Sequence, residues 1–302
     1  MRSLLWFLLA IVAALVLASL VAYPAWLAVH VAHPGWRIDK VAGRLFDLFA
    51  LLGLLGVTRH LDLANLRAWG FGLPRRAWLR QFGIGLAAGV ATMLPATFAM
   101  LALGVRTVAP GFSPALLGQA LLVGLGSGLA VGLLEEPVFR GLIQGAVIRD
   151  SRRPIVGILL VALFFAAVHF LAQQHIANEA VTPSSGLAIL TTVADKLLSP
   201  EGIADGFAAL FAVGLLLGLV AWWTGSVALS MGLHCGWVWM MRATLITTHY
   251  DAHGPNAGLI YADHGYVGWL SFAWTLVLLG VLVSNRRRLG AWRDPLVRAI
   301  RR

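Results

Sequence analysis

Long apolar stretches recur along the whole chain and restrict the fold more than any other feature. A membrane-spanning helix needs about 20 consecutive apolar residues. Eight stretches approach that length, at about residues 3–29, 41–57, 82–105, 114–134, 154–172, 206–223, 226–246 and 266–283. With 59% hydrophobic and only 12% charged residues, a soluble fold would expose too much apolar surface to water. The sequence therefore predicts an all-α, polytopic membrane helical bundle of about eight transmembrane helices.

We expect one membrane domain over residues 1–302, because no internal repeat, low-complexity tract or soluble segment separates the stretches. Strands are not expected, since lipid permits only helices or closed barrels to cross it. The first stretch follows Arg2 and has the charged start of a secretory signal, with cleavage near Ala22 as the alternative. Its length favours a retained helix.

Arginine carries most of the formal net charge of +10. The arginines lie between apolar stretches and in the tail 284–302, which is typical of cytoplasmic membrane loops, so we expect the lipid bilayer and no nucleic acid as a partner. Eight spans place both termini on one side. Putting the 59–80 loop, the 149–153 turn and the tail in the cytoplasm satisfies the positive-inside rule. We expect a multi-pass protein of a prokaryotic inner membrane.

Ionisable residues at membrane depth occur in the fourth stretch, which continues through Glu135, Glu136 and Arg140 to Arg149 and Asp150. An acid near the centre of a span costs roughly 2.5 to 3.5 kcal/mol, so each one needs a physical reason. The four-residue step from Glu136 to Arg140 places a carboxylate and a guanidinium on one helix face. For this pair, a structural ion pair is favoured over direct chemistry.

Glu135 lies about 100° around the helix from Glu136 and is left without a local partner. We interpret it as the chemically active acid. A hairpin turn near residues 150–154 would set Glu135 and His169 at similar depth. Phe165 precedes His169 by four residues, which predicts an aromatic ring beneath the imidazole on the same helix face.

His234 lies in the seventh stretch between Gly232 and Gly236, which let neighbouring helices approach closely. A buried histidine taken singly is as often a packed, hydrogen-bonded residue as a functional one. Together with Glu135 and His169, it indicates one polar site within the membrane.

A polar loop between the seventh and eighth stretches has the composition of a metal site, but its spacing fits no compact ligand set. Its residues are His249, Asp251, His253, Asp263 and His264. We expect Cys235 to be a small packed hydrophobe.

In these residues the sequence resembles the CPBP family of intramembrane proteases. This CAAX-protease, bacteriocin-processing and Abi-type group includes the eukaryotic endoproteases that trim prenylated proteins. The residues that match its three motifs, in order, are Glu135, Glu136 and Arg140, then Phe165 and His169, then His234. The resemblance covers about residues 115–245, the predicted protease core, and leaves 284–302 as a basic cytoplasmic tail.

The resemblance implies endopeptidase activity on a peptide or lipidated protein. In that mechanism Glu135, held with His169, activates a water as general base, and His234 stabilises the oxyanion. We favour the metal-free version and expect no cofactor. A zinc ion held by Glu135, His169 and His234 is the alternative.

One position departs from the family pattern, because Val238 stands where the third motif often has an asparagine. If that asparagine is an oxyanion partner, this chain relies on His234 alone or recruits another donor such as Ser230. The departure keeps open a catalytically inert membrane scaffold or immunity protein of the same fold. An ion-coupled transporter is a further alternative, although the lack of internal repeats argues against it.

Overall fold

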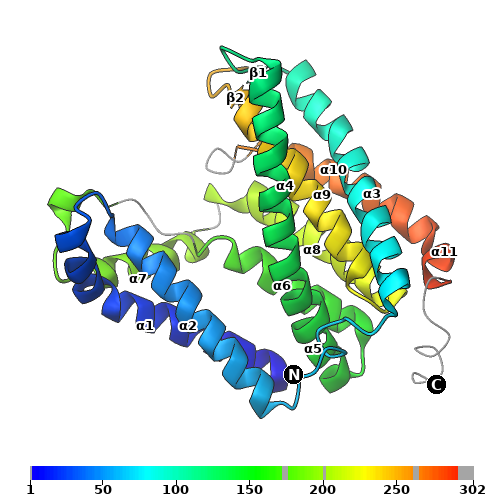
Figure 1. Ribbon diagram of the computed structural model, residues 1–302, viewed down its shortest axis with the longest axis horizontal. Helices are drawn as coiled ribbons and strands as arrows, with labels where there is room; N and C mark the ends of the chain where they lie inside the picture. The colour runs from blue at the N-terminus through cyan, green and yellow to red at the C-terminus, as the bar shows by residue number, and fades with distance from the viewer. Residues whose placement is uncertain (1, 172–175, 200–201, 261–264, 292–302) are drawn as a thin grey trace. The chain divides into compact units, whose positions relative to one another are not determined.

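The structure is a computed structural model that describes residues 2–171, 176–199, 202–260 and 265–291. Helices make up 78% of it, which confirms the predicted all-α class (Figure 1). Each of the eight apolar stretches forms a helix. These helices are α1 (Arg2–Ala32), α2 (Ile38–His60), α3 (Arg75–Ala102), α4 (Pro114–Glu136), α6 (Pro154–Val168), α8 (Ala204–Thr224), α9 (Ala228–Thr247) and α10 (Trp269–Ser284).

Within the described residues, five helices are long and apolar enough to cross a membrane, so the protein is an integral membrane protein. They are α1, α2, α3, α8 and the continuous helix Pro114–Ser151. The apolar helices α6 and α10 are shorter, with 15 and 16 residues. α9 is long enough to span a membrane, with 20 residues, but it is not apolar enough to belong to this group. Most of its side chains are buried against other helices, so it does not need an apolar surface facing lipid.

The chain divides into two compact units, which are described separately. Unit 1 consists of Met1–Ala64 and Ala167–Ile203, and unit 2 consists of Asn65–Ala166 and Ala204–Arg302.

Unit 1 contains the α1–α2 hairpin, the short turn η2 (Asn178–Ala180) and α7 (Ser185–Leu198). Residues 173–205 belong to none of the eight predicted apolar stretches, so α7 is an addition to the predicted helices. This helix forms because Ile189 and Val193 are buried on one side of it, and Ile189 joins the apolar core of α1 and α2.

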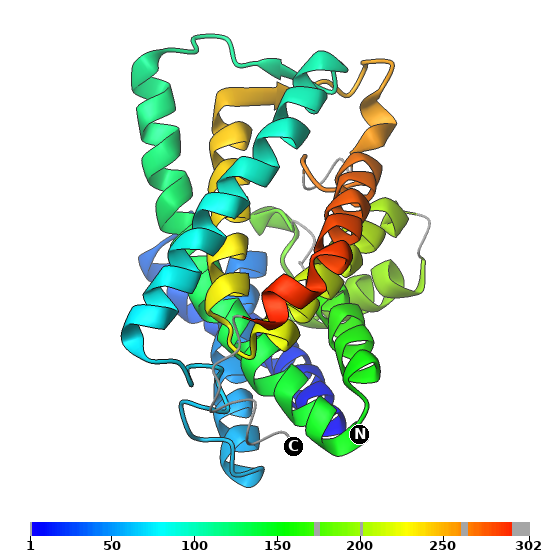
Figure 2. The same cartoon turned by 90° about the vertical axis from the view of Figure 1, so that its right-hand side faces the viewer.

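In unit 2, α9 lies beside α3, and glycines on both helices allow the contact (Figures 1 and 2). A Cβ atom added at Gly85 or Gly89 would clash with the backbone of α9. One added at Gly232 or Gly236 would clash with the backbone of α3. The prediction that Gly232 and Gly236 permit a close helix approach is confirmed.

A second set of glycines brings α4 against another side of α9. Gly124, Gly128 and Gly132 lie against the backbone of Trp239 and Cys235 and the Cys235 sulfur atom. Cys235 is buried in this contact, which agrees with its predicted role as a packed hydrophobe. The two glycine rows hold α9 between α3 and α4.

Two short strands connect the helix ends of unit 2. β1 (Arg106–Val108) follows α3 and pairs antiparallel with β2 (Thr248–Tyr250), which follows α9. The expectation of no strands was wrong for these connections, because the constraint imposed by lipid does not apply beyond the ends of the helices. Buried Arg106 links the strands by donating from Nε to Thr248 Oγ1 at 2.6 Å and from Nη2 to Thr248 O at 2.8 Å.

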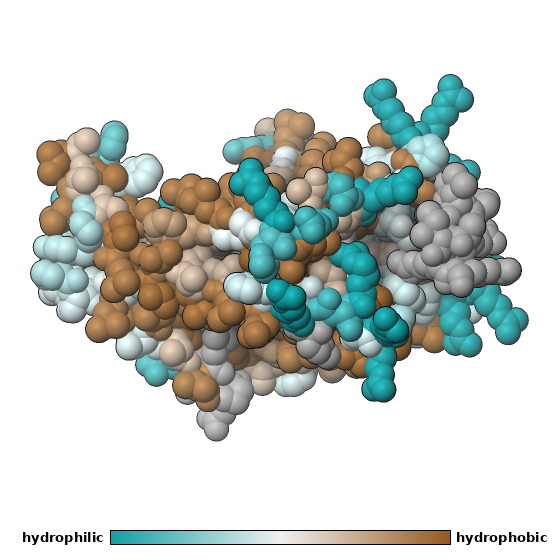
Figure 3. Space-filling model, turned by 90° about the horizontal axis from the view of Figure 1, so that it is seen from below, coloured by the Kyte–Doolittle hydropathy of each residue, from teal (hydrophilic) through white to brown (hydrophobic). Residues whose placement is uncertain are grey.

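Most exposed arginines in the described part of unit 2 lie at the helix ends opposite the strands, and Arg242 near the end of α9 is an exception. The arginines at these helix ends stand at the start of α3, in the turn before α6 and in α11 (Arg286–Gly290), namely Arg75, Arg76, Arg80, Arg149, Arg152, Arg153, Arg286, Arg287 and Arg288. Seen from below in Figure 3, hydrophilic side chains project from a surface that is otherwise largely hydrophobic. This clustering is typical of one membrane face.

We predict that Gly128→Leu destabilises unit 2, because a side chain at this position collides with the backbone of α9. Overpacking of this kind costs about 1–3 kcal/mol. The measurement is thermal unfolding of the purified protein in detergent. The control is Gly126→Leu, since a side chain at exposed Gly126 meets no atom within 4 Å. Equal losses in both variants would contradict the packing argument.

Candidate active site

A π-helical turn interrupts the long helix that carries the two glutamates. α4 ends at Glu136, the π-helical turn η1 covers Pro137–Ile143, and α5 covers Gln144–Ser151. Pro137 has no N–H and cannot donate the regular helical hydrogen bond. π-Helical turns occur frequently at functional sites. The predicted continuous helix is confirmed, but the change of helix type within it was not predicted.

The predicted turn near residues 150–154 is also present. Arg152 adopts a left-handed conformation with φ of 54°, and α6 begins at Pro154. The chain therefore reverses direction and places Phe165, a residue of α6, beside the π-helical turn. Phe139 of that turn meets Phe165 edge-on, with ring centroids 5.2 Å apart.

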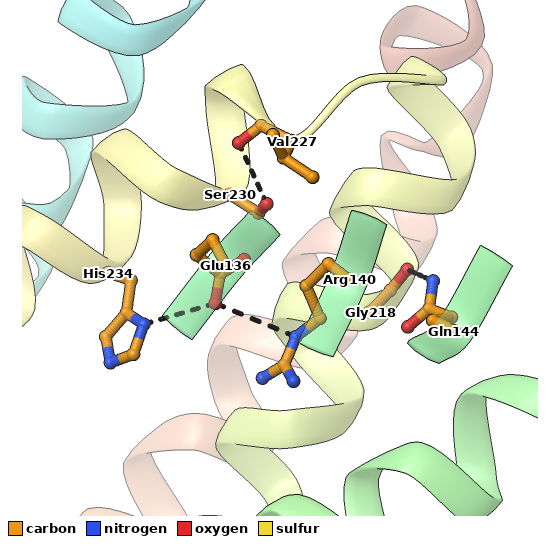
Figure 4. Close-up of polar contacts among 7 residues, drawn as sticks. All are labelled: Glu136, Arg140, Gln144, Gly218, Val227, Ser230 and His234. Atoms are coloured by element: carbon orange, nitrogen blue, oxygen red, sulfur yellow. Dashed lines mark hydrogen bonds and ion pairs between the residues drawn. The ribbon is translucent and has the colours of Figure 1, made fainter. Parts of the chain in front are cut away.

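The Glu136 carboxylate connects two other side chains of unit 2 (Figure 4). Its Oε1 atom lies 3.1 Å from His234 Nδ1 and 3.7 Å from Arg140 Nε. The Glu136 and Arg140 side chains are fully buried, and His234 is 6% exposed. The predicted Glu136–Arg140 pair is confirmed. The contact with His234 was not predicted, because helix spacing gives no information on contacts between helices.

The Glu136 contact fixes the orientation of the imidazole. When Nδ1–H donates to the carboxylate, Nε2 is left at the far side of the ring. Nε2 makes no hydrogen bond to any residue that the structure describes. The edge of the ring faces Phe165, with ring centroids 6.2 Å apart. His234 is thus held by its Nδ1 atom and has its second nitrogen available for a substrate.

Arg140 lies over an aromatic surface. Its Cζ atom is 4.4 Å from the centroid of Phe165 and 5.7 Å from that of Phe139. None of its three guanidinium nitrogens has a hydrogen-bond partner among the described residues. Its contact with Glu136 is therefore an ion pair without a hydrogen bond.

Glu135 is partly exposed, and its Oε2 atom is buried without a hydrogen-bond partner in the described part of the chain. This agrees with the expectation that Glu135 lacks a local partner. Its charge contributes to the electrostatic environment of Arg140. The negative charges of Glu135 and Glu136 therefore both act on the Arg140 guanidinium.

The fifth apolar helix ends earlier than residue 172, the predicted end. α6 stops at Val168, because Phe170 and Leu171 donate to the carbonyl groups three residues before them and tighten the chain into a turn. His169 lies in this turn and belongs to unit 1. The pairing of His169 with Glu135 and its stacking on Phe165 therefore stay predictions.

The two supporting positions of α9 are both buried. The Ser230 hydroxyl donates to Val227 O at 3.1 Å, within its own helix. Val238 follows His234 by one helical turn and is 9% exposed. The single donor of Ser230 therefore has the Val227 carbonyl and the nearby Glu136 carboxylate as acceptors, and Val238 offers no donor.

Gln144 is a residue that the sequence analysis missed. It follows Arg140 by four residues and donates from Nε2 to Gly218 O of α8 at 3.0 Å. The repeated four-residue spacing from Glu136 was the signal that would have identified it. This bond anchors α5 to α8 one helical turn after Arg140.

No group of three or more histidine, cysteine, aspartate or glutamate side chains is placed to hold a metal ion within the described residues. The alternative zinc set of Glu135, His169 and His234 includes residues of both units and stays a prediction. In the polar loop, Asp263 and His264 lie outside the described residues. We derive no reaction step through a metal.

Comparison with known proteins adds one match. Residues 117–240 match the sequence profile of the family described as type II CAAX prenyl endopeptidase Rce1-like. No curated protein and no solved structure matches the chain. The matched segment contains all three motifs and the Glu136 cluster. Residues 117–240 of this membrane protein therefore belong to the CPBP family of intramembrane proteases.

Proposed function

We propose that the protein is an intramembrane endopeptidase that cuts a peptide bond in a CAAX-type prenylated or leader-peptide substrate, using a water activated by Glu135. One observation carries the proposal. Glu136, His234 and Arg140 form a buried polar cluster within the segment that matches the CAAX endopeptidase family. Burying such groups is costly, and the cost is typically met where they serve function.

In the proposed reaction, Glu135 takes a proton from a water whose oxygen attacks the scissile carbonyl carbon. The electrons of the carbonyl double bond move to its oxygen, which becomes an oxyanion. His234, protonated on both nitrogens, donates from Nδ1 to Glu136 and from Nε2 to the oxyanion. Collapse of the intermediate breaks the C–N bond, and the proton held by Glu135 passes to the leaving nitrogen. His169 would hold Glu135, as the family resemblance implies.

We predict that Glu135→Gln lowers cleavage of a farnesylated CAAX peptide pool by about 100- to 10,000-fold, the usual contribution of a general base. Products are identified by mass spectrometry, using purified protein in detergent. Exposed Glu179 in unit 1 supplies the matched control Glu179→Gln, which should retain full activity. If folded wild-type protein cuts neither this pool nor a leader-peptide pool, an inert scaffold of the same fold is favoured.

We also predict that wild-type cleavage survives treatment with a zinc chelator, because no step requires a metal. The same peptide pool is assayed with and without chelator, and thermal unfolding is recorded in parallel. Loss of activity that added zinc restores, without loss of folding, would overturn the glutamate–water mechanism.

We propose further that the arginine-rich end of unit 2 faces the cytoplasm of a prokaryote. A fluorescent reporter that folds only in the cytoplasm should then be active when fused after Arg302 in a bacterial inner membrane. An alkaline phosphatase fused at the same position should be inactive. The opposite pattern would place the tail outside.

A further inference from the structure

Arg140 is buried in a way that the ion pair with Glu136 does not explain. Its side chain is fully buried, yet its five N–H donors find no hydrogen-bond acceptor among the described residues. Removing a charged donor from water without replacing its hydrogen bonds is expensive. Glu136 supplies a compensating charge at 3.7 Å but no hydrogen bond.

The two terminal nitrogens of the Arg140 guanidinium are directed away from Glu136. Nε faces Glu136, so Nη1 and Nη2 point away from that carboxylate (Figure 4). In the same view, the ring of His234 stands on the other side of Glu136, and its Nε2 end points in the same general direction. Two sets of unused donors therefore flank one carboxylate.

Phe165 contacts both donor groups and holds them in position. The guanidinium lies over its ring at 4.4 Å, and the ring also meets the His234 imidazole. A guanidinium stacked on an aromatic ring loses little freedom when it binds an acceptor in its own plane. Arg140 is thus held in place before any substrate arrives.

We propose that Arg140 is a catalytic residue whose Nη1 and Nη2 atoms donate to the oxyanion at the scissile carbonyl, together with His234 Nε2. The assignment rests on the proposed endopeptidase function and deepens it. The charge that develops on the carbonyl oxygen as water attacks is then met by two donors from different helices. No proton is transferred to or from Arg140.

Other side chains near His234 do not supply this second donor. Ser230 donates to Val227 O, and Val238 has no donor. Gln144 donates to Gly218 O on α8. Of the side chains in this cluster, Arg140 combines complete burial with terminal donors that have no acceptor.

The first test compares Arg140→Gln and Arg140→Lys with wild-type protein on a farnesylated CAAX peptide that wild type cuts in a Glu135-dependent manner. Because the contact forms in the transition state, kcat should fall about 100- to 1,000-fold in Arg140→Gln with KM changed less than about threefold. Arg140→Lys keeps the charge and should lose less. Gln144→Leu is the control for the loss of a buried polar group on the same helix, and should lower stability without lowering kcat of the folded fraction.

The second test separates catalysis from structure by binding. A phosphinate peptide carries a tetrahedral, anionic group in place of the scissile amide and should bind less tightly to Arg140→Gln by about the same factor as kcat/KM falls. Binding of the uncut amide peptide, measured in the Glu135→Gln background with and without Arg140→Gln, should change less than about threefold.

Three outcomes would overturn the assignment. These are unchanged kcat in Arg140→Gln, equal weakening of the phosphinate and amide peptides, and a loss of kcat that Gln144→Leu reproduces. A folded wild-type protein that cuts no peptide would instead refute the proposed function, and the role of Arg140 with it.

Discussion

The close approach of α4 and α9 is the constraint on which the site depends. Glycines along α4 bring its backbone against α9, and Glu136 at the end of α4 then reaches His234 at 3.1 Å. A carboxylate buried away from water must have partners, and here a histidine on one helix and an arginine on the next turn share one oxygen. Larger residues in the glycine row would separate the helices and leave Glu136 without His234.

The same packing explains the unusual composition of α9. A helix that faces lipid must be apolar, whereas one enclosed by protein can carry polar side chains that its neighbours satisfy. α9 contains buried His234, Ser230 and Thr244 as well as exposed Arg242, and it falls short of a spanning composition, unlike the other long helices of the described residues. α9 therefore presents His234 to Glu136 from a position enclosed by other helices of unit 2.

The two glutamates have different surroundings and are assigned different roles. Glu136 is fully buried and bound to Arg140 and His234, which suits a carboxylate that positions other groups. Glu135 is partly exposed, with an oxygen atom that has no partner within the described residues, which suits a carboxylate that meets water. Adjacent positions on one helix point in different directions, so neighbouring residues acquire separate tasks.

Sequence alone determined the membrane class, the helical fold and the Glu136–Arg140 pair, because apolar length and four-residue spacing are local properties. The same is true of the turn before α6 and of the motifs that identify the family. Only the tertiary structure decided that Glu136 contacts His234, that Arg140 lies on Phe165 and that α6 ends at Val168. These features depend on how separate helices pack, and residues 98 positions apart in the chain give no local signal of their contact.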